Sequence, residues 1–185
     1  MAGKGRTIEE MMQPNHMDIC WHDYTDTAGG PLVTEAKLPE KAAVVGRVGL
    51  MLLSCGTGAW RVRESMNSLA EQLGLTCTAN IGLMSIDYTC FDGKKSFSQS
   101  LSLANTGVNT SKLNRLERFA HEFPGKWIRM SAAEIHTVLD EIEASGGLYS
   151  PALLGLASAL ACGAFAFLLG GGWSIVICAF LGAGA

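Results

Sequence analysis

The stretch Ser96-Phe97-Ser98-Gln99-Ser100-Leu101-Ser102-Leu103 decides the fold of the first part of this chain. Every second residue is a serine, and the residues between the serines are mostly apolar. Successive side chains of a strand point to opposite faces of a sheet, so Phe97, Gln99, Leu101 and Leu103 share one face and the serine hydroxyls share the other. This pattern predicts an antiparallel strand with one buried face and one solvated face.

Two further stretches with β propensity precede this strand. Residues 75–81 and 83–91 are rich in Thr, Ile, Tyr and Phe, and Asp92-Gly93 is typical of a hairpin turn. These features predict the remaining strands of a small antiparallel sheet.

Apolar residues recur at helical spacing on both sides of the predicted strands. Before the strands, residues 41–55 and 60–73 predict two helices, and Gly46 and Gly49 in the first of them permit close packing. Gly74 is a good stop for the second helix.

Two more helices are predicted after the strands. Residues 112–123 form the first, with an N-cap offered by Asn109-Thr110-Ser111. Ser131 and Glu134 have the spacing of a capping box at the start of the second, which Gly146-Gly147 ends. The predicted fold class is an α+β domain over residues 41–147, in which helices pack on a small antiparallel sheet. Residues 1–40 are rich in turn formers and predict a flexible N-terminal arm.

Charge is distributed very unevenly along the chain. All 14 Lys and Arg and all 17 Asp and Glu lie at or before Glu143. Residues 151–169 form an uncharged apolar run, about as long as the roughly 20 residues that a helix needs to cross a bilayer. Residues 173–185 are apolar again but too short to span alone, and Trp173 is a natural interfacial anchor. We therefore expect transmembrane α-helices over residues 148–185, with a first span at 151–169 and a second, incomplete span begun at 173. The alternative is a buried helical hairpin.

The remaining composition limits location and partners. Residues 1–13 contain no apolar run and no cleavage site, so no secretory signal is predicted and the first domain is expected in the cytoplasm. Lys126 and Arg129, near the first predicted span, agree with this orientation. The six cysteines lack C-x-x-C spacing, which is typical of a reducing compartment. The net charge of −3 does not favour a nucleic-acid partner.

Three groups of residues suggest chemistry, and each has a simpler interpretation. His16, Cys20 and His22 could bind a metal, but their spacing matches no established zinc pattern and a surface arm explains them. Gly56-Thr57-Gly58 could cradle a phosphate but lacks the Gly-Lys-Ser/Thr ending of a P-loop, so a turn between helices explains it better. Ser54 or Cys55 could be a nucleophile with His121 or His136 as its base, although no nucleophile-elbow motif accompanies them. We therefore expect no enzyme, no cofactor and no metal.

Two further features leave alternatives open. Lys112, Arg115 and Arg118 form a basic ridge that could touch anionic lipid headgroups or could be a solvated helix face diluted by acidic neighbours. Asp87 interrupts an apolar strand, either as an outward position of the alternation or as a polar group near a translocation path.

Three stretches, taken together and in order, resemble the threonine/serine exporter family, in particular the larger subunit of its split, two-component form. The first runs from Leu53 to Met66, followed by Leu69-Ala70 and Leu73-Gly74, and is similar to the family's small-Gly-Ala-aromatic-Arg-Val-Glu helix–turn–helix. The second is Asp92-Gly93 and the strand after it, leading into Thr106-Gly107-Val108-Asn109, and it is similar to the family's Arg-Gly-Ile-Asn helix entry, with Thr106 in place of Arg. The third runs from Ala164 to Trp173 and continues at Ala179–Gly182, and it resembles the family's first transmembrane hairpin.

This resemblance implies a secondary transporter subunit that exports threonine and serine, or dicarboxylates such as succinate, across the bacterial inner membrane. It implies a multi-pass protein in the lipid bilayer, truncated after its first hairpin. The missing spans would come from a small integral membrane partner or from a missing C-terminal half, and we also expect a homo-oligomer. Structural or conformational roles, not catalytic ones, are expected for seven residues: Gly56, Arg61, Glu64, Asn109, Gly171, Gly172 and Trp173. The alternative is a membrane-tethered cytoplasmic binding or regulatory module without transport activity of its own; a membrane-anchored hydrolase is the third hypothesis.

Overall fold

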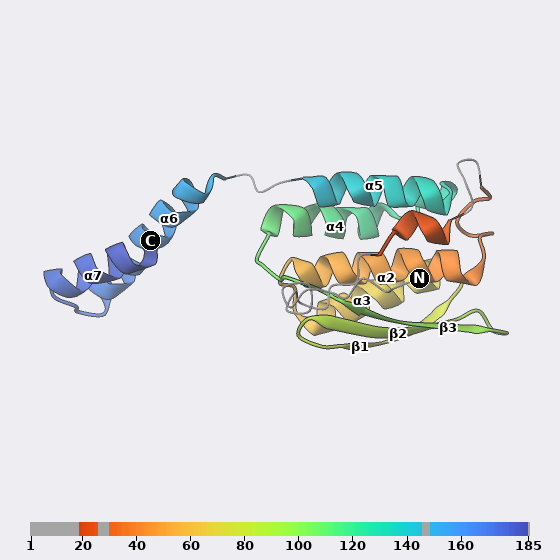
Figure 1. Cartoon of the computed structure of the whole chain (residues 1–185), viewed down its shortest axis with the longest axis horizontal. Coiled ribbons are helices and arrows are strands. Elements are labelled where there is room, and N and C mark those ends of the chain that lie inside the picture. The colour runs from red at the N-terminus through yellow and green to blue at the C-terminus, as the bar shows by residue number, and fades with distance from the viewer. Residues whose placement is uncertain (1–18, 26–29, 146–148, 185) are drawn as a thin grey trace, which may run out of the picture. The chain divides into compact units, whose positions relative to one another are not determined.

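The structure, a computed structural model, describes residues 19–25, 30–145 and 149–184. The chain divides into two compact units, Met1–Ser145 and Gly146–Ala185, and each is described here by itself. Figure 1 shows that the first unit combines helices with a three-stranded sheet, whereas the second consists of two helices.

The sheet of the first unit is antiparallel, with strand order β1-β2-β3. Its strands are β1 (Thr76–Ile81), β2 (Ser85–Phe91) and β3 (Ser96–Ser102). The predicted alternation is observed, because Leu101 is buried and the serines at 96, 98 and 100 are exposed. The second strand begins later than predicted, since Gly82 N donates to Ser85 O at 2.8 Å and leaves residues 83 and 84 to form the turn.

Helix α2 (Leu38–Ser54) is the centre of the first unit. It contacts β2 and β3 on one side and α4 and α5 on another, and Figure 1 shows it between the sheet and these two helices. Twelve of its residues are buried, which is why its sequence is apolar on almost every side. Two glycines permit the close approach, since a Cβ at Gly46 would lie 2.4 Å from the Tyr88 hydroxyl oxygen and one at Gly49 would lie 2.5 Å from the Met66 sulfur.

The other helices of the first unit follow the predicted patterns closely. Helix α3 (Ala59–Gln72) packs on β1 and ends before Gly74, which has a φ of 71°. Helix α4 (Thr110–Glu122) begins at the N-cap Asn109. After the 3₁₀ turn η2 (Trp127–Arg129), α5 (Ala132–Ala144) begins with the complete capping box of Ser131 and Glu134.

The predicted arm over residues 1–40 is described only in part, because residues 1–18 and 26–29 lie outside the described residues. The described part contains the short 3₁₀ helix η1 (Trp21–Tyr24), which packs on α2 and α5. A bridge between Leu32 and Ser131 then fixes the approach to α2.

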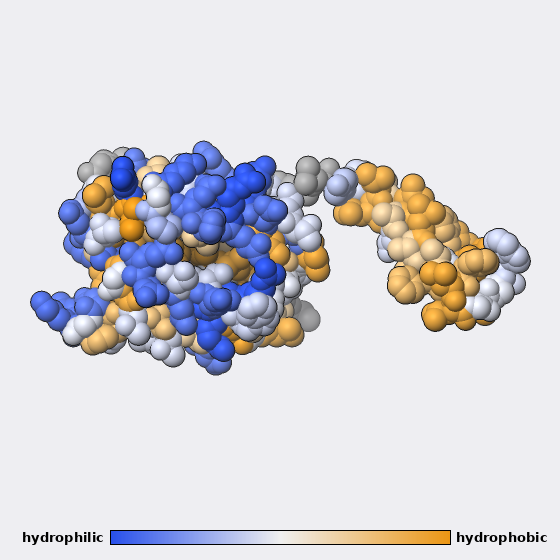
Figure 2. All heavy atoms as spheres, turned by 180° about the vertical axis from the view of Figure 1, so that it is seen from behind, coloured by the Kyte–Doolittle hydropathy of each residue, from blue (hydrophilic) through white to orange (hydrophobic). Residues whose placement is uncertain are grey.

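The second unit is a hairpin of α6 (Pro151–Leu168) and α7 (Trp173–Gly184). Small residues line the contact between the two helices, since a Cβ at Gly155 would lie 3.1 Å from the carbonyl oxygen of Gly184. The unit buries little of its own apolar surface. Ala159 is its one buried hydrophobic residue among those described, and Figure 2 shows apolar side chains over most of the visible surface of this unit.

The prediction of transmembrane α-helices over residues 148–185 is wrong, because no helix in the described part of the chain is both long and apolar enough to cross a membrane. Helix α6 stops at Leu168, and Gly170 then turns the chain with a φ of 81°. At about 1.5 Å per residue, a helix that ends there falls short of a hydrocarbon core about 30 Å thick. Helix α7 has only 12 residues.

Candidate functional site

The strongest candidate site in the first unit is a polar pocket between the α2–α3 turn and the loop that precedes α4. We call it the loop pocket. Its volume is about 430 Å³, which suits a small metabolite. The residues that line it come from both loops and from the first turn of α4: Ser54, Cys55, Asn105, Thr106, Gly107, Val108, Asn109 and Lys112.

Backbone hydrogen bonds hold the two loops of this pocket together. Gly107 N donates to Ser54 O at 3.1 Å, and Asn109 N donates to Cys55 O at 3.4 Å. Gly56 turns the chain beside them with a φ of 77°, a conformation that glycine adopts without strain. The Asn109 side chain accepts from Lys112 N at 3.0 Å and so starts α4 at the rim of the pocket. Two of the predicted site residues, Gly56 and Asn109, are thus brought together.

Lys112 provides the positive charge of the loop pocket. Burial raises the pKa of the Cys55 thiol, although a hydrogen bond with Ser54 and the nearby Lys112 charge oppose this rise. A buried thiol with a raised pKa is a poor nucleophile at neutral pH. Neither His121 nor His136 lines the pocket. This pocket therefore does not bring Ser54 or Cys55 together with His121 or His136.

Arg61 and Glu64 lie on α3, at a neighbouring surface. Arg61 forms an ion pair with Glu117 of α4 at 2.9 Å, and both side chains are about half exposed. A shallow pocket between α3 and α4 is lined by Arg61, Glu64, Glu117 and His121. Arg61 therefore connects α3 to α4 through this ion pair, and Gly56-Thr57-Gly58 forms the turn between α2 and α3.

The remaining predicted site residues lie in the second unit, at the turn between α6 and α7. Gly171 N donates to Ala166 O at 2.9 Å, and a Cβ on Gly171 would lie 2.8 Å from that oxygen, so the turn requires a glycine there. The carbonyl oxygen of Gly172 accepts from residues 175 and 176 in the first turn of α7. Trp173 is exposed and packs near Phe167, with ring centroids 6.1 Å apart.

The candidate metal ligands serve another purpose or fall outside the structure. His16 lies outside the described residues. His22 pairs with Asp140 through Nε2 at 2.8 Å, and Cys20 is exposed. Within residues 19–25, 30–145 and 149–184, no group of three or more His, Cys, Asp and Glu side chains is placed to hold a metal ion.

The sequence analysis missed a buried cluster around Arg47 of α2. Arg47 is 2% exposed and donates to the carbonyl oxygen of His136 at 2.9 Å, to Glu143 at 2.8 Å and to Asp140. Trp21 covers the guanidinium from η1, with 5.9 Å between Cζ and the ring centroid, a cation–π distance. The sequence did contain a signal for this cluster. Arg47 is the one charged residue in the apolar run 42–53, and a buried charge needs polar or charged partners.

The acidic partners of Arg47 lie at the end of α5. Burial works against ionisation of Asp140, but hydrogen bonds from His22 and Arg47 hold its pKa below the ordinary value. The cluster therefore ties η1, α2 and the last turns of α5 to one another. We call it the Arg47 cluster.

We expect His136 to make the stability of the first unit depend on pH. Burial and then the Arg47 charge lower its pKa to about 3, whereas an unfolded histidine has a pKa of about 6.5. Between about pH 3 and pH 6.5, only the unfolded state binds a proton at His136. The contribution of His136 to the free energy of unfolding is therefore complete above about pH 6.5 and falls by up to about 1.4 kcal/mol per pH unit below it. Urea unfolding between pH 4 and 7 measures this slope.

The matched variants are His136→Asn, which should flatten the slope, and His121→Asn at an exposed position, which should leave it unchanged. Equal slopes in the wild type and in His136→Asn would contradict this assignment.

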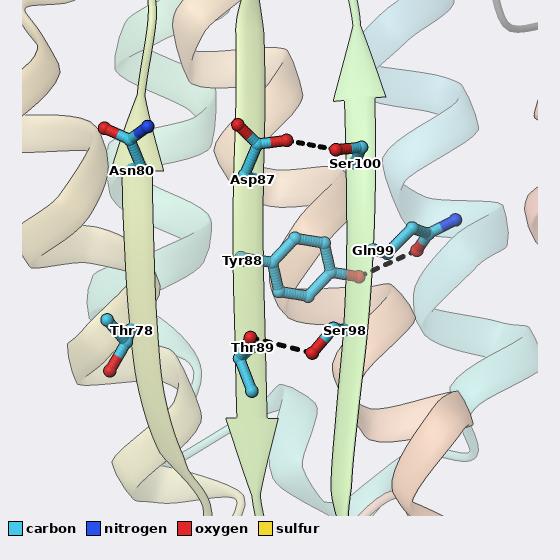
Figure 3. A pocket seen from close by; sticks show the side chains of 8 residues that line it. All are labelled: Thr78, Asn80, Asp87, Tyr88, Thr89, Ser98, Gln99 and Ser100. Carbon is cyan, nitrogen blue, oxygen red and sulfur yellow. Dashed lines mark hydrogen bonds between the residues drawn. The ribbon is translucent and has the colours of Figure 1, made fainter.

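Asp87 belongs to the solvated face of the sheet. Figure 3 shows it directed toward Ser100, with which it forms a hydrogen bond, beside the pair of Thr89 and Ser98 at 2.8 Å. An open pocket of about 320 Å³ lies over these side chains. Asp87 is therefore an outward position of the alternation, which was one of the two interpretations left open by the sequence.

The basic ridge on α4 does not form one surface. Lys112 lines the loop pocket, whereas Arg115 and Arg118 line a groove between α4 and α5 together with Glu122 and Glu141. The acidic residues of this groove offset its charge, which agrees with the interpretation as a solvated helix face.

The chain was compared with known protein families, curated proteins and solved structures. Residues 43–185 match the sequence model of the family described as "Putative threonine/serine exporter". The chain belongs to this exporter family. The match begins in α2 and includes every element of the loop pocket and the whole second unit, whereas Trp21 and His22 of the Arg47 cluster lie before it. No curated protein and no solved structure matches the chain.

Proposed function

We propose that this exporter-family chain is a secondary transporter subunit that exports small polar metabolites across the bacterial inner membrane. The observation that carries the proposal is the family match over residues 43–185, which covers most of the first unit and all of the second. The substrates proposed are threonine and serine, or dicarboxylates such as succinate. Within the family, we assign the chain to the larger subunit of the two-component form.

The chemistry of the loop pocket supports a substrate with a carboxylate. The Lys112 ammonium is suited to pair with a carboxylate, and the side chains of Asn105 and Thr106 offer hydrogen bonds to a hydroxyl or to a second carboxylate. Its volume of 430 Å³ leaves room for a molecule of this size with several waters. We therefore propose that the loop pocket receives the metabolite on the cytoplasmic side.

The second unit supports the need for partners. Large apolar side chains remain exposed on both of its helices, including Leu160, Phe165 and Ile175. A continuous exposed apolar surface of this kind marks a site of interaction. We propose that a small integral membrane partner, lipid and further copies of this chain cover it in a homo-oligomeric complex.

Efflux from cells tests the function directly. Cells that produce the chain with its partner are loaded with labelled threonine or succinate, and efflux is compared with cells in which the gene is deleted. Deletion should lower efflux of at least one of the two substrates. Unchanged efflux of both would contradict the proposed transport function.

The substitution Lys112→Gln tests the loop pocket separately. A charge-assisted hydrogen bond contributes about 1.5–3 kcal/mol, so we expect binding of the exported substrate to weaken roughly tenfold or more. Lys94→Gln, at an exposed position in the β2–β3 turn, is the matched control and should bind as the wild type does. Calorimetry on the purified chain measures both. Normal affinity in Lys112→Gln would show that the loop pocket does not bind the exported substrate. The efflux result would still stand, because it does not depend on this pocket.

The alternative function is a membrane-tethered binding or regulatory module without transport activity of its own. The observation in its favour is that the loop pocket and the Arg47 cluster both lie in the first unit. Under this alternative, deletion of the gene would abolish capture of a partner while efflux continued at its normal rate.

A further inference from the structure

Two cysteines lie directly opposite each other in the sheet. Cys77 of β1 and Cys90 of β2 are partners in the strand register. They are 8% and 0% exposed, and both are free thiols. Their side chains therefore meet on the covered face of the sheet.

The type of strand pair determines how close their backbones are. Gly82 N donates to Ser85 O at 2.8 Å, which makes the pair next to the two-residue turn a hydrogen-bonded one. Hydrogen-bonded and non-hydrogen-bonded pairs alternate along an antiparallel ladder. Ile81–Ile86 is therefore non-hydrogen-bonded, and so is every second pair beyond it, including Cys77–Cys90.

Non-hydrogen-bonded partners bring their Cα atoms to about 4.5 Å. Disulfides form when the two Cα atoms are roughly 4.4–6.8 Å apart, so this pair lies at the near end of the permitted range. The backbone of the reduced sheet already satisfies the distance that a cross-strand disulfide requires.

The two thiols also differ in reactivity. A hydrogen bond from Cys90 lowers the pKa of the Cys77 thiol, and burial opposes this effect only in part. The same interaction, together with burial, raises the pKa of Cys90. The thiolate is the reactive form of cysteine, and Cys77 is also the more exposed of the two, so Cys77 is the nucleophile of the pair and Cys90 is its resolving partner.

We propose that Cys77 and Cys90 form an oxidation site that a hydroperoxide converts into a disulfide between β1 and β2. The Cys77 thiolate attacks one peroxide oxygen, the O–O bond breaks, and Cys77 becomes a sulfenic acid while hydroxide leaves. The Cys90 sulfur then attacks Cys77 Sγ, the S–O bond breaks, and the Cys90 proton leaves with the hydroxyl group as water. Two thiols are oxidised and one hydroperoxide is reduced; with hydrogen peroxide, two waters form.

The position of the site in the sheet provides access. Strand β1 is an edge strand, and Cys77 is the one of the two that retains some exposure. A hydroperoxide as small as hydrogen peroxide can reach it through local opening of this edge.

The test is carried out on the full chain with Cys20, Cys162 and Cys178 replaced by serine, because these three are exposed and would form other products. The chain is treated with hydrogen peroxide, free thiols are alkylated, and peptides are identified by mass spectrometry. We expect a 77–90 disulfide, with a loss of two hydrogens, to form about tenfold faster than any oxidation of the buried, solitary Cys55. In Cys90→Ser, a dimedone adduct should appear on Cys77 instead.

Circular dichroism before treatment confirms that each variant is folded. The proposal would be overturned if Cys77 were oxidised at the same rate as Cys55. It would also be overturned if Cys77 and Cys90 were still free thiols, and so alkylated, after Cys55 had been oxidised. A dimedone adduct on Cys90 rather than on Cys77 would overturn the assignment of the nucleophile.

Discussion

Arg47→Ala is expected to destabilise the first unit by about 3 kcal/mol or more, because removal of one partner from a buried ion pair leaves the other groups uncompensated. The carbonyl oxygen of His136 loses its donor, and Trp21 loses the guanidinium that it covers. Asp140 and Glu143 are about half exposed, so water can solvate them, which places the loss near the lower end of the usual range. Urea unfolding of the full chain in a neutral detergent, followed by tryptophan fluorescence, measures it.

Arg47→Met separates charge from volume. The methionine fills much of the space of the arginine without its charge, and apolar replacements of buried ion pairs often cost little. We expect a loss of about 1 kcal/mol for Arg47→Met, well below that for Arg47→Ala. If both variants unfolded within about 0.5 kcal/mol of the wild type, the Arg47 cluster would have no role in stability.

Gly46→Ala is expected to cost about 2–3 kcal/mol through overpacking. The new Cβ would lie 2.4 Å from the hydroxyl oxygen of Tyr88 and 2.8 Å from its ring carbon Cε1. Tyr88 is 2% exposed, and its hydroxyl lies 3.0 Å from the Ala42 carbonyl oxygen and 2.9 Å from Gln99 Oε1. The ring cannot move aside without losing these contacts, so α2 must separate from the sheet.

Gly49→Ala is the matched control on the same helix. Its Cβ would meet the sulfur of Met66 at 2.5 Å, but a methionine side chain is flexible and can choose another rotamer. We expect a loss at least about 1 kcal/mol smaller than that of Gly46→Ala, because the Met66 side chain can move away from the new Cβ whereas Tyr88 cannot. Equal urea midpoints for the two variants, or a lower midpoint for Gly49→Ala than for Gly46→Ala, would contradict this explanation.

Local patterns predicted most of the first unit. The alternation of residues 96–103, the Asp92-Gly93 turn and the capping box at Ser131 each depend on neighbours in sequence, and the structure shows all three. The family resemblance was also confirmed over residues 43–185. These signals are readable because period-2 and period-3.6 patterns follow directly from strand and helix geometry.

The predictions that failed or were missing depend on distant contacts or on length. Composition suggested a span at 151–169, but the helix stops at Leu168, where the glycine run turns the chain, and apolar composition alone does not fix that end. The loop pocket requires residues 54–55 and 105–112 to meet, and the Arg47 cluster joins residues more than 100 positions apart, from Trp21 to Asp140. No local pattern encodes these pairings.

Trp21 also has an evolutionary consequence. It covers a buried charge from a segment that lies before the part of the chain shared with the family, so the family fold by itself does not guarantee the cover. A lineage that lost Trp21 would expose the guanidinium of Arg47 to water, and one that lost Arg47 would leave Trp21 without its cation. We expect inherited changes at these two positions to occur together, so that the segment before the shared region and the central helix diverge as a pair.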